Sequence, residues 1–162
     1  MPEYSTGFSE KLIDAAQIIM DIGLDSMDAK RTVLYLSLLS CEIALKAILE
    51  RAGKSVAEIT RCSHNFKKLL ALLSTCQIEV EISNGHLKWV PAVRIRSVKV
   101  DSSYWNATLG NLLTANDLGF SQYPNQIRYG DSLRHYPPEM MLKAAKKTLE
   151  WVNNYWNRIR IA

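Results

Sequence analysis

The segment IRYGDSLRHYPPE, residues 127–139, contains an arginine and a histidine separated by six residues, Arg128 and His135. An imidazole with an ordinary pKa of about 6.5 can take up or release a proton at neutral pH, so it can serve as a general acid or base. A guanidinium can stabilise negative charge that develops in a transition state. The two residues are therefore a candidate catalytic pair that needs no metal ion.

The sequence around this pair also has a structural interpretation. Residues 130–132 read Gly-Asp-Ser, which is typical of a turn or a cap, and Pro137-Pro138 begins a helix only after the histidine. His135 would then be a loop residue bonded to the backbone, and Arg128 would donate to carbonyl groups at a helix end. We expect that both residues organise the start of the last helix, with catalysis as the alternative.

The composition is that of an ordinary globular protein. The 162 residues include 48% hydrophobic and 22% charged residues, and the mean hydropathy is close to zero, which is typical of a soluble chain. The length suits one domain over residues 1–162. The N-terminal segment lacks a basic stretch followed by an apolar block, so we expect a cytoplasmic protein. Glu42 and Lys46 interrupt the longest apolar run, so we expect no membrane contact.

The cysteines do not form a recognisable site. Cys41, Cys62 and Cys76 are odd in number, widely spaced and without a C-x-x-C pair. This pattern argues against a disulfide framework and against a closed zinc site. We therefore predict neither a metal nor a cofactor.

The charge permits contact with an acidic polymer. The formal net charge is +4, with a pI near 9.0. Basic residues form two clusters, the first with Lys88, Arg94, Arg96 and Lys99 and the second with Arg134, Lys143, Lys146 and Lys147. We take Arg94, Arg96 and the second cluster as candidate contacts for phosphate groups. The alternative is that both clusters are solvated faces that keep the protein soluble.

Several segments carry the periodicity and the capping residues of helices. Apolar residues recur at steps of three and four from Phe8 to Ile22, and Gly23 ends this segment. Ser63 can cap a short helix, and Pro138 suits the first turn of the last one. The predicted helices are 8–22, 25–52, 63–74, 106–118 and about 138–159.

The second of these helices is apolar on nearly every side, from Val33 to Glu50. Neighbouring helices must therefore cover it from several directions, which predicts a bundle. Glu42 and Lys46 are four residues apart within it, so we expect them to satisfy each other as a structural pair. A functional carboxylate at Glu42 is the alternative.

The periodicity changes to two in QIEVEISNGHLKWV, residues 77–90. Asn84-Gly85 is the preferred pair for a two-residue type I′ turn and predicts a hairpin with Ile82 opposite Leu87 and Val80 opposite Trp89. Residues 92–100, AVRIRSVKV, could add a third strand. The predicted fold is thus mainly α, an antiparallel bundle of four to five helices with a small antiparallel β-hairpin or meander inserted at about residues 77–105.

Short motifs in this order resemble the HEPN superfamily. They are "SCEIALKAILERAG" in the second helix, "HN" before "FKKLLALL", and "IRY" before the last helix. The resemblance covers about residues 8–74 and 126–158, and the strand-rich middle has no counterpart in it. It implies that His64 of the "HN" dipeptide has a structural role at the start of the third predicted helix.

The resemblance implies a helical homodimer in a defence, stress or toxin-antitoxin setting. One branch of the family contains metal-independent endoribonucleases in which four to six residues separate an arginine from a histidine, and Arg128 and His135, with six residues between them, match this spacing at its upper limit. RNA would supply its 2′-hydroxyl as the nucleophile. The other branch binds ligands or partners such as small nucleotidyltransferases and antitoxins. Tyr129 stands where active members commonly have a polar residue, which favours this binding branch.

The sequence is compatible with three functions. The first is a binding module for nucleotide, RNA or a partner protein, using Tyr129 and the basic surfaces. The second is a metal-independent endoribonuclease that uses the Arg-x6-His motif. The third is a regulatory protein-interaction subunit without nucleic acid, in which the charge serves solubility.

Overall fold

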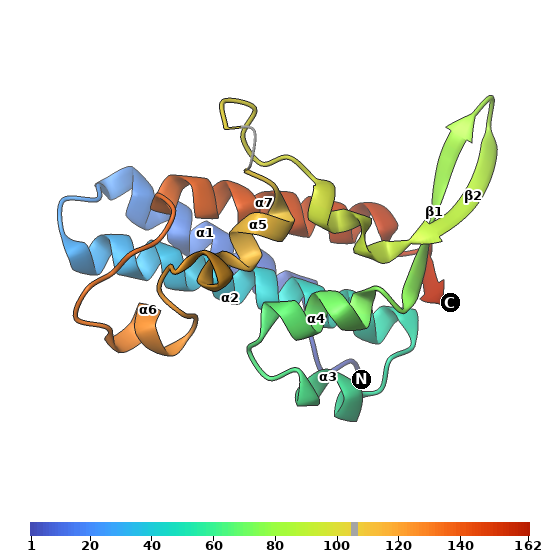
Figure 1. Ribbon diagram of the computed structural model, residues 1–162, viewed down its shortest axis with the longest axis horizontal. Helices are drawn as coiled ribbons and strands as arrows, with labels where there is room; N and C mark the ends of the chain where they lie inside the picture. The colour runs from blue at the N-terminus through green and yellow to red at the C-terminus, as the bar shows by residue number, and fades with distance from the viewer. Residues whose placement is uncertain (105–106) are drawn as a thin grey trace.

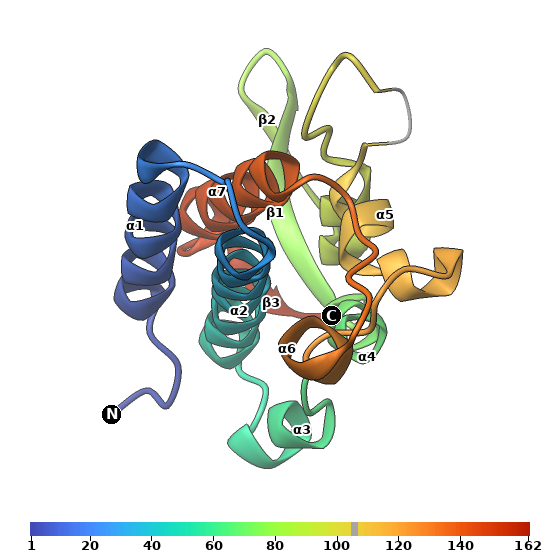
Figure 2. The ribbon, with the colours of Figure 1, turned by 90° about the vertical axis from the view of Figure 1, so that its left-hand side faces the viewer.

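The computed structural model describes residues 1–104 and 107–162, which form a mainly α-helical protein with a small three-stranded antiparallel sheet (Figure 1). Three long helices lie side by side: α1 (Thr6–Ile22), α2 (Met27–Ala52) and α7 (Pro138–Tyr155). Figure 2 views them nearly end-on, with the shorter helices gathered on one side. This arrangement confirms the predicted helical class with a small β insertion.

Helix α2 lies at the centre of the core. Its buried residues span Val33 to Leu49, and it packs against both α1 and α7. Ser9 of α1 bonds to Ser40 in the middle of α2, while Arg51 at the end of α2 bonds to the carbonyl of Trp156. Helix α1 therefore runs antiparallel to α2, and α7 runs parallel to it.

By length and composition alone, α2 could cross a membrane. In the fold, however, 72% of its most apolar stretch is buried inside the protein. Its apolar surface is thus covered by the protein's own helices, as the all-round pattern predicts.

Capping residues set the limits of the long helices. Ser5 and Ser26 accept bonds from Phe8 N and Ala29 N at the starts of α1 and α2, and this satisfies amides that a helix start leaves free. Pro138 occupies the first turn of α7, as predicted. The buried face of α1 differs from the predicted stripe, because it consists of Ser9, Leu12, Ile13 and Ala16. Phe8 and Ile22 are instead exposed.

Shorter helices cover one side of α2 (Figure 2). They are α3 (Val56–Arg61), α4 (Phe66–Leu73), α5 (Leu109–Leu113), the 3₁₀ turn η2 (Ala115–Leu118) and α6 (Asn125–Tyr129). The predicted helix 106–118 is thus divided into α5 and η2, and its first residue, Asn106, lies outside the described residues. Asn65, rather than Ser63, caps α4. Helices α3 and α6 were not predicted from the sequence.

The predicted hairpin is present, with β1 (Cys76–Ser83) and β2 (His86–Pro91) projecting from the helical body (Figure 1). Asn84 and Gly85 both have positive φ, at 48° and 78°, as a type I′ turn requires. The predicted register was wrong beyond the turn, because an irregularity between Glu81 and Ser83 shifts the pairing. Trp89 therefore faces Glu79 instead of Val80.

The third strand comes from the other end of the chain. Residues Ile159–Ile161 form β3, which pairs with β1 on the side away from β2. The last helix consequently ends at Tyr155 rather than near Ile159. Residues 92–97, predicted as a strand, form the 3₁₀ helix η1. Three-residue spacing places Ala92 and Ile95 on one buried face, and a short apolar run does not distinguish this from a strand.

Helix α5 approaches η1 closely at Gly110. A Cβ atom at this position would lie 2.9 Å from Cβ of Arg96 and 3.0 Å from its carbonyl oxygen. Only a glycine therefore allows this contact, which places α5 and η2 beside α4. A pocket lies between α4, α5 and η2.

Candidate functional site

A buried carboxylate connects α2 to the shorter helices. Glu42 of α2 is only 2% exposed, and its Oε1 accepts bonds from Lys46 Nζ at 2.8 Å and from His64 Nδ1 at 2.9 Å. Its Oε2 accepts a bond from Tyr123 Oη at 2.5 Å. Three donors from three parts of the chain thus satisfy one buried charge.

Lys46 is the buried counterion in this group. It is 7% exposed, lies one helical turn from Glu42, and its ammonium stands 5.6 Å from the centre of the Tyr4 ring. The predicted pairing of Glu42 with Lys46 is therefore present in the fold. The carboxylate of this pair also accepts bonds from His64 and Tyr123, which the sequence did not connect to it.

The carboxylate orients the imidazole of His64. This residue lies just before α4, and its side chain is 53% exposed although its Nδ1 is bound to Glu42. When Nδ1–H donates to the carboxylate, Nε2 carries the lone pair and remains available to another molecule. Besides the structural role expected for it, His64 thus presents a fixed imidazole at the surface.

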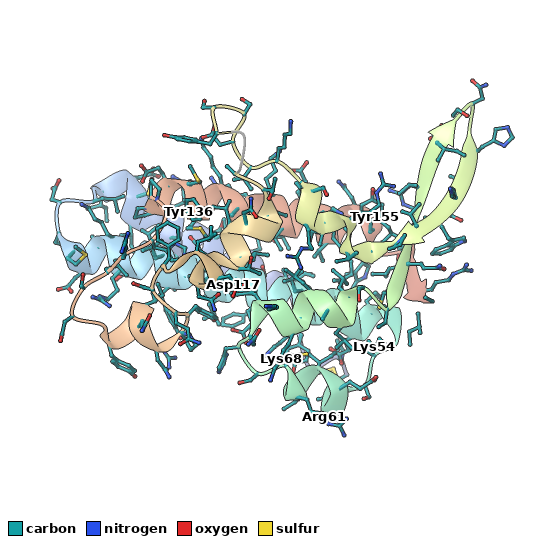
Figure 3. All side chains as sticks on the ribbon, viewed as in Figure 1. Lys54, Arg61, Lys68, Asp117, Tyr136 and Tyr155 are labelled. Carbon is teal, nitrogen blue, oxygen red and sulfur yellow. The ribbon has the colours of Figure 1, made fainter. Side chains whose placement is uncertain are left out.

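His64 lines a pocket of about 270 Å³ between α4, α5, η2 and the segment before α7. Its walls include Lys68 of α4, which Figure 3 labels, and His135 of the segment before α7. Amide side chains and aromatic rings complete the lining, among them Asn65, Asn116, Gln122, Phe66 and Tyr123. Among the described residues that line this pocket, none is acidic.

His135 contributes the second imidazole of the pocket. Burial lowers its pKa to about 4, with a smaller opposing effect from the backbone of Tyr136. It is therefore neutral at pH 7. Its ring lies 5.9 Å from that of Phe120 and 6.0 Å from that of Tyr136. Its Nδ1 is buried without a hydrogen-bond partner in the described part of the chain.

Arg128 lies apart from this pocket. Its guanidinium donates to the hydroxyl of Tyr35 and stands 4.9 Å from the centre of the Tyr35 ring. It is exposed and is not one of the residues that line the pocket with His135. The structure thus does not bring Arg128 and His135 together in one cavity.

The structural role expected of Arg128 belongs to a different arginine. Arg31 of α2 donates to the carbonyl groups of Gln126, Ile127 and Gly130 at the end of α6. It thereby fixes α6, and with it the segment that supplies Tyr123 to Glu42. The position of this segment depends on α2, which is distant in sequence.

The predicted lysine cluster lies on a different surface. Lys143, Lys146 and Lys147 of α7 line a hollow that also contains Asp101 and Glu150. Lys143 lies 3.4 Å from Asp101 and Lys147 3.7 Å from Glu150, while Lys146 donates to Gln17. These carboxylates offset part of the positive charge, which weakens the case for a phosphate-binding face here.

The remaining predicted binding residues are dispersed. Tyr129 is 76% exposed at the end of α6. Arg134 is also exposed, and its backbone is held by Ser121. Arg94 lines a groove under the hairpin together with Trp151 and Tyr155, and Arg96 lies on the exposed side of η1.

The pocket was not predicted from the sequence because its walls come from distant segments of the chain. His64 and Lys68 are four residues apart around the start of α4, and this spacing was the only local signal available. The contact between Tyr123 and Glu42 spans 81 residues. Comparisons of this chain with protein-family models, curated proteins and solved structures find no match.

Proposed function

We propose that this chain is a HEPN-like module that binds a nucleotide or a segment of single-stranded RNA in the pocket between α4 and the segment before α7. One observation carries the proposal: Lys68, two imidazoles and several amide groups line this pocket without an acidic residue among its described walls. A lysine can contact phosphate, and amide groups can bond to base edges. Tyr123, which packs against the buried Phe66 at 5.3 Å between ring centres, adds aromatic surface for a base.

The size of the pocket supports a small ligand. At about 270 Å³, it lies near the lower limit of small-molecule sites, roughly 300 Å³. This volume suits one unpaired nucleotide and is too small for a duplex. The resemblance to HEPN proteins adds a homodimer, and a nucleotidyltransferase or antitoxin as partner, to the proposal.

Replacing Lys68 with alanine is expected to weaken the binding of a short single-stranded oligoribonucleotide by about tenfold or more. One lost phosphate contact should also reduce the salt dependence, lowering the slope of log affinity against log salt by about 0.7. Fluorescence anisotropy over a series of salt concentrations measures both quantities.

Lys67 provides a matched control for this experiment. It is adjacent in sequence and exposed, but it lies 3.7 Å from Asp117 and does not line the pocket. Lys67→Ala should therefore bind nearly as wild type does. Equal losses in the two variants would indicate general charge attraction and would contradict a site at the pocket.

The endoribonuclease alternative retains one observation in its favour, the position of His135 in the pocket wall. Because Arg128 stacks on Tyr35 outside this pocket, we expect purified protein to leave structured RNA intact in EDTA. Cleavage that leaves 2′,3′-cyclic phosphate ends, and that disappears in both His135→Ala and Arg128→Ala, would establish the enzyme instead.

A further inference from the structure

We infer that the pocket recognises a phosphate monoester, the terminal phosphate of a nucleotide or of an RNA end, and not an internal phosphodiester. The inference rests on the proposed function and names the chemical group that the pocket selects. His64, Lys68 and His135 line the pocket from three separate segments. Lys68 can donate hydrogen bonds to phosphate oxygens, and an imidazole can do so from a ring nitrogen that carries a proton.

The charges around the pocket favour an anion. Lys68 lines the pocket, whereas its neighbour Lys67 lies outside it and is paired with Asp117. Glu42 lies behind His64, and both of its oxygens already accept bonds from Lys46, His64 and Tyr123. The nearest buried carboxylate is therefore engaged, and its charge is offset by the ammonium of Lys46 at 2.8 Å.

The hydrogen-bond donors on the side chains that line the pocket suit a terminal phosphate better than an internal one. A monoester has three terminal oxygens and carries roughly −1.5 to −2 charges at pH 7, whereas a diester in a nucleic-acid strand carries a single negative charge and has two free oxygens. Asn65, Asn116 and Gln122, whose side chains carry amide groups, line the same pocket as Lys68 and the two histidines. With a third free oxygen and more negative charge, a terminal phosphate can accept more of these donors than an internal phosphate can.

His135 points to the same ligand. A buried polar atom without a partner costs roughly 1–3 kcal/mol, and Nδ1 of His135 is such an atom in the described part of the chain. The imidazole lines the pocket beside His64 and Lys68. In the tautomer with the proton on Nδ1, a phosphate oxygen that reaches this atom would accept its hydrogen bond and remove part of the cost.

The test compares four probes by isothermal titration calorimetry at pH 7: a nucleoside 5′-monophosphate, the same nucleoside, a dinucleoside monophosphate and inorganic phosphate. We expect the monophosphate to bind at least tenfold more tightly than the nucleoside and than the dinucleoside monophosphate. We also expect an oligoribonucleotide with a 5′- or 3′-phosphate to bind more tightly than the same oligonucleotide with hydroxyl ends.

The test uses two pocket variants and two control variants. His64→Gln and Lys68→Ala should each remove most of the preference for the monophosphate, while Lys67→Ala and His86→Gln, which change residues outside the pocket, should retain it. Circular dichroism of all four variants verifies the fold. A preference that survives in both pocket variants would overturn the inference.

The outcomes separate this inference from the proposed function. If RNA binds equally with and without a terminal phosphate, the inference fails and the proposed function stands. If inorganic phosphate binds as tightly as the nucleotide, the phosphate site is supported and nucleotide recognition fails. If none of the probes binds, both are wrong.

Discussion

Glu42→Ala is expected to lower the free energy of unfolding by about 3–5 kcal/mol, the range for removing one partner of a buried ion pair. The loss arises because Lys46, with a side chain only 9% exposed, would keep its charge in the core without the carboxylate at 2.8 Å. His64 and Tyr123 would lose their acceptor at the same time. Urea denaturation at neutral pH measures this change.

Two control variants isolate the cause. Asp14→Ala breaks an exposed ion pair with Lys11, at 3.9 Å, and should cost less than about 1 kcal/mol. In the double variant Glu42→Leu/Lys46→Met, both charges are gone, so it should be more stable than Glu42→Ala. If Glu42→Ala is no less stable than Asp14→Ala, the buried network does not stabilise the fold as described.

The second large effect concerns pH. The pKa of His135 is lowered to about 4 by burial, below the ordinary value of about 6.5. Between these values the unfolded chain binds more protons than the folded chain, so folding stability is complete above about pH 6.5 and falls as the pH drops toward 4. The shift corresponds to a loss of up to about 3 kcal/mol.

His135→Gln removes this titrating group. Its free energy of unfolding should therefore fall less than that of wild type between pH 7 and pH 4, by up to about 3 kcal/mol. The carboxyl groups that titrate in the same range are common to both proteins and cancel in the comparison. His86→Gln, on the exposed end of the hairpin, serves as the control. Parallel pH curves for His135→Gln and wild type would show that His135 is not held neutral by burial.

Much of the helical architecture could be predicted from local sequence. The steps of three and four in α1, the all-round apolar pattern of α2 and the proline at the start of α7 each predicted a helix that the structure contains. The Asn84-Gly85 turn predicted the hairpin. These features succeed because capping, turn geometry and helical periodicity depend on residues within a few positions of one another.

Local sequence patterns did not predict the secondary structure of short segments that could adopt more than one conformation. Residues 92–97 alternate well enough for a strand, but the space beside α5 at Gly110 is filled by a 3₁₀ helix. Strand β1 pairs on its other side with residues 159–161, the first of which the helical pattern had placed at the end of the last helix. For such segments the choice depends on partners that lie elsewhere in the chain.

The sequence by itself determined which residues could carry charge or protons, and it correctly placed Glu42 beside Lys46 on one helix. Only the tertiary structure decided that His64 and Tyr123 share that carboxylate, that His64 and His135 line one pocket, and that Arg128 lies outside it. The physical reason is that helical spacing defines neighbours over about four residues. Contacts across 22 and 81 residues are defined only when the helices pack around α2.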